Sequence, residues 1–179
     1  MKTKLWLVDD HQVVRSGLRM LLAGENDMEI IGESGTARDA IAAMKEQQPD
    51  VMIMDIGLPD LSGIDATREI KRFNPQVAII ALTIHEDEEY FFRMLEAGAS
   101  GYVPKRAAPE ELMTAIRAAA KGEVYLYPSL AKYLVKDFLA QERNQAAQSL
   151  DGLTAREQEI LRYLAEGIGN DEIANSLVK

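Results

Sequence analysis

The chain has 179 residues, of which 47% are hydrophobic and 27% charged, proportions typical of a globular protein that exclude a disordered one. It has no cysteine, which excludes a disulfide framework, a thiolate metal site and a cysteine nucleophile, and which fits a reducing cytosol. A net charge of −9 argues against binding nucleic acid through bulk electrostatic attraction.

The N-terminal segment does not have the pattern of a targeting or membrane sequence. Its first apolar stretch, at 5–8, is too short for a signal peptide and runs directly into two aspartates. No later stretch is long and apolar enough to span a membrane. We therefore expect a cytoplasmic protein that does not associate with membranes.

Short apolar runs alternate with helical patterns through the first 125 residues. We predict five strands, at 5–8, 28–31, 51–54, 77–82 and 101–103. The runs are continuously apolar and each is followed by a helical pattern, which predicts a parallel sheet covered on both faces. Five such units have the size of a flavodoxin-like, doubly wound α/β fold with strand order 2-1-3-4-5.

The pattern changes after Gly122. The pattern at 129–142 predicts a helix, and we interpret the polar run that follows it as the end of a linker. Thr154 and Glu157 then form a capping box ahead of a helix, and Asn170 caps a second one. We predict three parts, namely a domain at 1–125, a helical linker at 126–150 and a partial all-α unit at 151–179.

Three aspartates follow two of the predicted strands. Asp9 and Asp10 come after the first strand and Asp55 after the third. In the order 2-1-3-4-5 these strands are neighbours, and their carboxyl ends border the crevice of the fold, so the three carboxylates should meet. Clustered carboxylates repel one another unless they are protonated or neutralised by a cation. Oxygen ligands at an open edge suit Mg²⁺.

Two further side chains complete this edge. Thr83 follows the fourth strand and Lys105 the fifth. A hydroxyl and an ammonium beside a magnesium–carboxylate site can stabilise the oxygens of a transferring phosphoryl group. We therefore expect Asp55 to be a nucleophile that forms an acyl phosphate. Each of these residues alone could simply be a polar strand end, so the prediction depends on the whole set.

Four segments of the sequence resemble the receiver domain of two-component response regulators: LVDDH (7–11), MDIGLPDLSGID (54–65), ALTIHED (81–87) and GYVPK (101–105). The resemblance covers roughly residues 3–121. It implies that Asp55 is the phosphoacceptor and that a histidine kinase is the phosphodonor. It also implies that Asp9, Asp10, Asp55 and the main-chain carbonyl of Gly57 hold Mg²⁺, with Asp10 the more direct ligand.

The same resemblance implies roles for residues around the phosphoryl group. Thr83 and Lys105 would contact its oxygens, and Thr83 and Tyr102 would form the conformational switch. Gly57 stands where many receivers carry a side chain, and His85 lies where the family tunes access of attacking water. We predict that Gly57 and His85 set the lifetime of the phosphorylated state. The expected readout is dimerisation, giving a homodimer, or release of a helix-turn-helix.

The segment LTAREQEILRYLAEGIGNDEIANSL (153–177) resembles the first half of the four-helix DNA-binding domain of the LuxR/NarL class. In that class the recognition helix, which enters the major groove, follows this segment. We expect DNA binding from a form that carries the recognition helix and not from these 179 residues alone. The expected function is control of transcription by a phosphorylated regulator.

Two other functions fit parts of the sequence. The first is a Mg²⁺-dependent phosphohydrolase using Asp55, but such enzymes need a second acid two residues on, where this chain has Gly57. The second is a receiver-only adaptor that binds a protein partner, which the DNA-binding resemblance disfavours. Turnover of an aryl phosphate would indicate the hydrolase, whereas stoichiometric self-labelling would indicate the regulator. We expect no enzyme activity beyond self-phosphorylation from a donor and self-dephosphorylation.

Overall fold

The computed structural model describes residues 2–139. By its internal contacts the chain divides into a unit that ends at Ala131 and a second that begins at Lys132. The helical pair predicted within 151–179 and the linker residues beyond 139 lie outside the described part of the chain.

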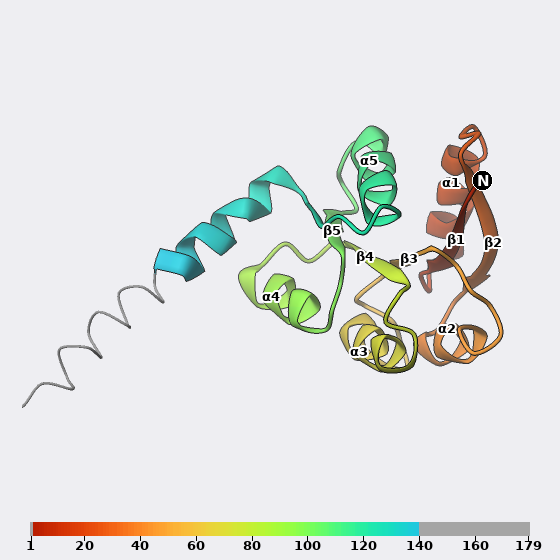
Figure 1. Cartoon of the computed structure of the whole chain (residues 1–179), viewed down its shortest axis with the longest axis horizontal. Helices are drawn as coiled ribbons and strands as arrows, with labels where there is room; N and C mark the ends of the chain where they lie inside the picture. The colour runs from red at the N-terminus through yellow and green to blue at the C-terminus, as the bar shows by residue number, and fades with distance from the viewer. Residues whose placement is uncertain (1, 140–179) are drawn as a thin grey trace, which may run out of the picture. The chain divides into compact units, whose positions relative to one another are not determined.

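Six parallel strands form one sheet in the order β2-β1-β3-β4-β5-β6 (Figure 1). In chain order the elements are β1 (Thr3–Val8), α1 (Gln12–Leu22), β2 (Met28–Ser34), α2 (Ala37–Ala43), β3 (Val51–Met54), α3 (Gly63–Phe73), β4 (Ala78–Thr83), α4 (Glu88–Glu96), β5 (Gly101–Pro104), α5 (Pro109–Ala119), β6 (Tyr125–Leu126) and the short 3-10 helix η1 (Pro128–Leu130). The predicted flavodoxin-like fold and its order 2-1-3-4-5 are confirmed. The sixth strand was not predicted, because two residues have no periodicity to read.

Helices cover both faces of the sheet, as continuously apolar strands require. Figure 1 shows α1 and α5 on one face and α2, α3 and α4 on the other. Successive strand side chains point to opposite faces, so Leu5 and Leu7 of β1 pack in the core beneath α1 and α5. By the same alternation Tyr102 of β5 faces α4, where its ring meets Phe91 edge-on at 5.6 Å between centroids.

Local capping fixes where the helices begin and end. The side chains of Thr36, Ser62 and Asp87 accept hydrogen bonds from main-chain N–H groups in the first turns of α2, α3 and α4. Gly98 ends α4 with a φ of +96°, a conformation that glycine adopts without strain. The three N-terminal caps end the loops after β2, β3 and β4, at the carboxyl edge of the sheet where the predicted site lies, whereas Gly98 precedes β5 at the opposite edge.

The chain leaves the sheet through β6. Main-chain N–H groups of Tyr125 and Tyr127 donate to the carbonyls of Ser100 and Tyr102. Leu130 in η1 is buried, and residues 131–139 are helical, in agreement with the start of the predicted linker helix. Within residues 2–139, none of the helices combines the length and the apolar character that a membrane crossing needs.

Candidate phosphoacceptor site

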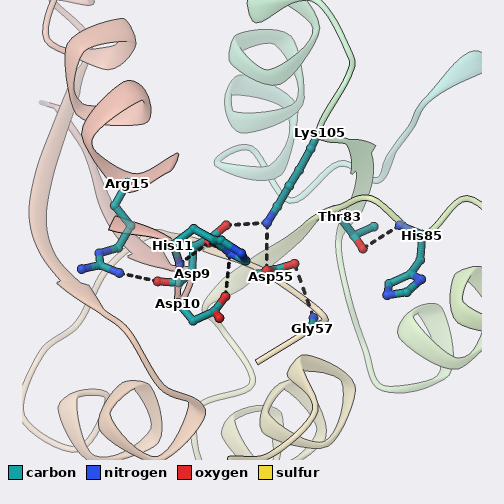
Figure 2. Close-up of polar contacts among 9 residues, drawn as sticks. All are labelled: Asp9, Asp10, His11, Arg15, Asp55, Gly57, Thr83, His85 and Lys105. Carbon is teal, nitrogen blue, oxygen red and sulfur yellow. Dashed lines mark hydrogen bonds and ion pairs between the residues drawn. The ribbon is translucent and has the colours of Figure 1, made fainter. Parts of the chain in front are cut away.

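The carboxyl edge of the sheet brings the predicted carboxylates together (Figure 2). Asp9 and Asp55 are buried, with 2% and 4% of their surface exposed, whereas Asp10 is exposed. One ligand atom from each of Asp9, Asp10, His11 and Asp55 lies within 4.8 Å of the others. Residues 45 positions apart therefore meet, as the strand order predicts.

Lys105 lies between two of these carboxylates. Its Nζ is 2.7 Å from Asp9 Oδ2 and donates a hydrogen bond to Asp55 Oδ2 at 2.8 Å. Burial alone would lower the pKa of Lys105, but the hydrogen bonds and negative charges of Asp55 and Asp9 outweigh it and raise that pKa. The ammonium thus remains charged and neutralises part of the acidic cluster.

Main-chain contacts hold Asp55 at the end of β3. Its N–H donates to the carbonyl of Val8 on the neighbouring strand β1. Behind it, the first residue of α3 approaches so closely that a Cβ on Gly63 would lie 2.0 Å from the Asp55 carbonyl oxygen. Only glycine lets the helix pack this closely against the Asp55 peptide.

Two residues at the site had no role in the sequence analysis. His11 Nδ1 lies 3.1 Å from Asp9 Oδ1 and 2.8 Å from Asp10 Oδ1. Arg15 on α1 donates from Nη1 to the Asp9 carbonyl at 2.5 Å. In the sequence, the only indication of a role was that both residues follow the aspartate pair closely. Their contacts could not be predicted, because these depend on how α1 packs beside β1.

Gly57 lies beside an open space over Asp55. Its N–H contacts Asp55 Oδ1 at 3.4 Å, and an added Cβ would meet no atom within 4 Å. A cavity of about 230 Å³ opens here, lined by His11, Val14, Asp55, Gly57, Ile84, His85 and Lys105. Both histidines of the chain thus face the space above the candidate phosphoacceptor.

The predicted switch residues meet at His85. The Thr83 hydroxyl accepts a hydrogen bond from the main-chain N–H of His85 at 3.1 Å. The Tyr102 hydroxyl donates to the carbonyl of the same residue at 2.6 Å, and Tyr102 is fully buried. The His85 ring itself stacks on Tyr90. One residue of the loop after β4 therefore joins both side chains that the resemblance assigns to the switch.

The acidic cluster fits a hard divalent cation. Asp9, Asp10 and Asp55 offer carboxylate oxygens that lie within 4.8 Å of one another, and Asp9 Oδ2 contacts Lys105 Nζ at 2.7 Å. Oxygen-rich, partly open sites suit Mg²⁺. An acidic pocket of this kind is where the resemblance to receiver domains implies that Mg²⁺ binds.

Comparisons with known proteins agree with this geometry. The model of the response regulator receiver domain matches residues 5–117, and the model of bacterial regulatory proteins of the luxR family matches residues 151–178. The chain is 40% identical over 177 residues to the uncharacterized transcriptional regulatory protein YxjL of Bacillus subtilis (strain 168), covering 98% of this chain and 81% of that protein.

Solved structures give the same result. A LuxR-family two-component response regulator from Aurantimonas sp. SI85-9A1 matches with a TM-score of 0.74 and 34% identity, over 78% of this chain and 99% of that one. A structure of two RcsB dimers bound to two parallel DNAs matches with a TM-score of 0.69 and 27% identity, over 100% and 84% of the two chains. The chain belongs to the LuxR-type response regulators of two-component systems, in which a receiver domain is joined to a DNA-binding segment to control transcription.

Proposed function

We propose that Asp55 is the residue that receives the phosphoryl group. Transfer breaks the P–N bond to a histidine of the kinase and forms a P–O bond to a carboxylate oxygen of Asp55. Asp55 supports this role because it is buried, ionically paired to Lys105 and open to the cavity beside Gly57. Its contact with Lys105, 50 residues away, is the observation on which the proposal chiefly depends.

Asp9, Asp10, Asp55 and the Gly57 carbonyl would hold Mg²⁺. When bound, the ion would neutralise the carboxylates and the incoming phosphoryl oxygens. Lys105 would exchange its contact with Asp55 for one with a phosphoryl oxygen. Its charge, maintained by a raised pKa, is suited to that task.

Thr83 would couple phosphorylation of Asp55 to a change in the loop after β4. Its hydroxyl is held by the His85 N–H, a single neutral hydrogen bond whose net contribution is about 1 kcal/mol. A phosphoryl oxygen offers a charged and therefore stronger partner. Rotation of Thr83 would free His85 and, with it, the carbonyl that holds the Tyr102 hydroxyl. Phosphorylation would in this way bias an existing equilibrium between two conformations.

Gly57 and His85 would set how long the acyl phosphate survives. Space beside Gly57 is open, so water can approach Asp55 there. A bulky apolar side chain, as in Gly57→Leu, would narrow the cavity and lengthen the half-life of the phosphorylated protein. The half-life is measured by following loss of phosphate after the donor is removed.

We also propose three parts of the chain and two kinds of partner. We assign 1–125 to the receiver, 126–150 to the linker and 151–179 to the DNA-binding segment. Receiver domains take phosphoryl groups from histidine kinases, and RcsB binds DNA as dimers. By analogy, this regulator would be a cytoplasmic protein that forms a homodimer when phosphorylated, and DNA binding would involve the recognition helix.

The decisive experiment is intact-mass analysis after incubation with acetyl phosphate and Mg²⁺. The wild-type chain should gain one phosphoryl group, and Asp55→Asn should gain none. Asp65→Asn is the matched control, because it removes a nearby aspartate that pairs with Arg68 on α3. Omitting Mg²⁺ should prevent labelling of the wild type. Labelling of Asp55→Asn would contradict the proposal.

The same samples test the hydrolase alternative. A regulator should take up phosphate stoichiometrically and show no sustained turnover of an aryl phosphate. The absence of a side chain at Gly57 favours this outcome, since no acid at that position can protonate a leaving group. Sustained turnover that disappears in Asp55→Asn would instead assign an enzyme.

A further inference from the structure

Arg15 contacts the acidic cluster from the side opposite Lys105 (Figure 2). Its side chain is only 15% exposed, and its Nη1 donates to the main-chain carbonyl of Asp9 at 2.5 Å. Its Nε lies 3.6 Å from Glu33 Oε1 and has no hydrogen-bond partner within the described residues. A buried guanidinium nitrogen without a hydrogen-bond partner is costly, which indicates that the position of Arg15 matters for something besides stability.

The main chain is hydrogen-bonded on both sides of Asp9, and Arg15 holds the peptide between Asp9 and Asp10. The N–H of Asp9 donates to the Ser34 carbonyl on β2, and the carbonyl of Asp9 accepts from Arg15. Glu33, next to Ser34, pairs with Arg15 and with Arg19 on α1. The main chain at Asp9 is therefore held on both sides, by β2 and by α1.

We propose that Arg15 is a positioning residue for the metal site. By fixing the Asp9 peptide it holds the carboxylates of Asp9 and Asp10 where they can bind Mg²⁺ together. This inference rests on the proposed function, because it assumes that these carboxylates are the ligands. Groups that orient metal ligands in other proteins change metal affinity by about 10- to 100-fold when mutated.

The charge of Arg15 has the opposite effect. A guanidinium near a cation site repels the cation, so loss of the charge alone would tighten binding. Glu33 offsets that charge, and Arg15 contacts a carbonyl rather than a carboxylate of the site. The positional effect should therefore exceed the electrostatic one, and the sign of the change in Mg²⁺ affinity distinguishes the two.

The test is calorimetric titration of the whole chain with Mg²⁺ alone, without phosphodonor. Arg15→Met should raise the dissociation constant about tenfold. Arg15→Lys, which keeps the charge and one donor group, should recover part of the loss. Arg19→Met is the matched control, since Arg19 pairs with the same Glu33 and has no contact with Asp9, and it should bind Mg²⁺ like the wild type.

A second variant and a second measurement distinguish a loss of positioning from a folding defect. Glu33→Gln keeps Arg15 but removes the charge that pairs with its guanidinium. This variant should therefore raise the Mg²⁺ dissociation constant by a smaller factor than Arg15→Met. Amide NMR shifts of residues 9–11 should move in Arg15→Met and not in Arg19→Met. Unchanged or tighter Mg²⁺ binding by a folded Arg15→Met would overturn the inference and leave the proposed function intact. Failure of the wild type to bind Mg²⁺ would overturn both.

Discussion

The turn after β1 and the loop after β4 lie at the same edge of the sheet but are held in different ways. In the first, residues 9–11, the main chain at Asp9 is hydrogen-bonded to β2 and α1, and the Asp9 side chain is buried. In the second, residues 84–87, Ile84 is 74% exposed, and the main chain at His85 is held by the hydroxyls of Thr83 and Tyr102.

This difference fits the two tasks that we propose for these regions, metal binding by the turn and signalling by the loop. A site that gathers like charges needs ligands fixed by surrounding structure, since each carboxylate would otherwise turn away from its neighbours. A loop that responds to phosphorylation must change conformation at a small cost in free energy. Side-chain hydrogen bonds, which hold the loop after β4, contribute only about 1 kcal/mol each. Regions that move in signalling come from the less stable parts of a fold. The fixed turn and the releasable loop should therefore respond differently to substitution.

The largest effect is expected from a substitution behind the fixed part of the site. Gly63→Ala would place a Cβ 2.0 Å from the Asp55 carbonyl oxygen, and neither main chain can easily yield. We expect the free energy of unfolding to fall by about 3 kcal/mol and phosphorylation to slow, because overpacking shifts the backbone. Gly57→Ala is the control, because its Cβ meets open space and should leave urea unfolding nearly unchanged. Equal stability of the two variants would refute a tight contact at Gly63.

Removal of the central cation should have the next largest effect. Lys105→Met leaves Asp9 and Asp55 without their shared partner, and without Mg²⁺ it should cost about 2 kcal/mol at neutral pH. The pKa of Lys105 is raised in the folded state. The stabilisation that its charge gives to the folded protein is therefore complete below the unfolded pKa and is lost as pH rises through the folded pKa. Urea unfolding with a chelator should show the wild type and Lys105→Met converging at strongly alkaline pH. A constant difference across that range would argue against the ion pairs.

A smaller effect is expected in the releasable loop. Tyr102→Phe removes the hydrogen bond to the His85 carbonyl and keeps the packing on Phe91, so it should cost about 1 kcal/mol. Amide hydrogen exchange should increase in residues 84–87 and stay unchanged in residues 9–11. The initial rate of phosphorylation should stay close to that of the wild type. Faster exchange at both places would show that the turn and the loop are not independent.

The smallest effect concerns Asp60, which joins the loop after β3 to α2. Its carboxylate accepts hydrogen bonds from the N–H groups of Ala37 and Arg38. Desolvation raises the pKa of Asp60, but these backbone hydrogen bonds outweigh it and lower that pKa overall. The stabilisation that the ionised Asp60 gives to the folded protein is present above the unfolded pKa and is lost as pH falls through the folded pKa. Asp60→Ala should therefore be slightly less stable than the wild type at neutral pH and equal to it in strong acid, as thermal unfolding across pH can check.

Much of this fold could be predicted from the sequence because strand ends are encoded locally. Continuous apolar runs define β1, β3, β4 and β5, and the parallel order follows from the alternation of strands and helices. Asp9, Asp10, Asp55, Thr83 and Lys105 could then be placed at one edge, since the carboxyl ends of parallel strands lie together. The structure brings one oxygen of each aspartate within 4.8 Å of the others and pairs Lys105 with Asp9 and Asp55. Their roles in phosphoryl transfer remain predictions.

The tertiary structure alone decided the partners of these residues. Arg15 reaches the Asp9 carbonyl only because α1 packs beside β1, and Gly63 is required only because α3 meets the Asp55 peptide. The pairing of β6 with β5 and the meeting of Thr83 and Tyr102 at His85 likewise join residues with no shared local pattern. Periodicity records which face of an element is buried, whereas a hydrogen bond between elements depends on side-chain rotamers and on helix position, which are set when the whole core packs.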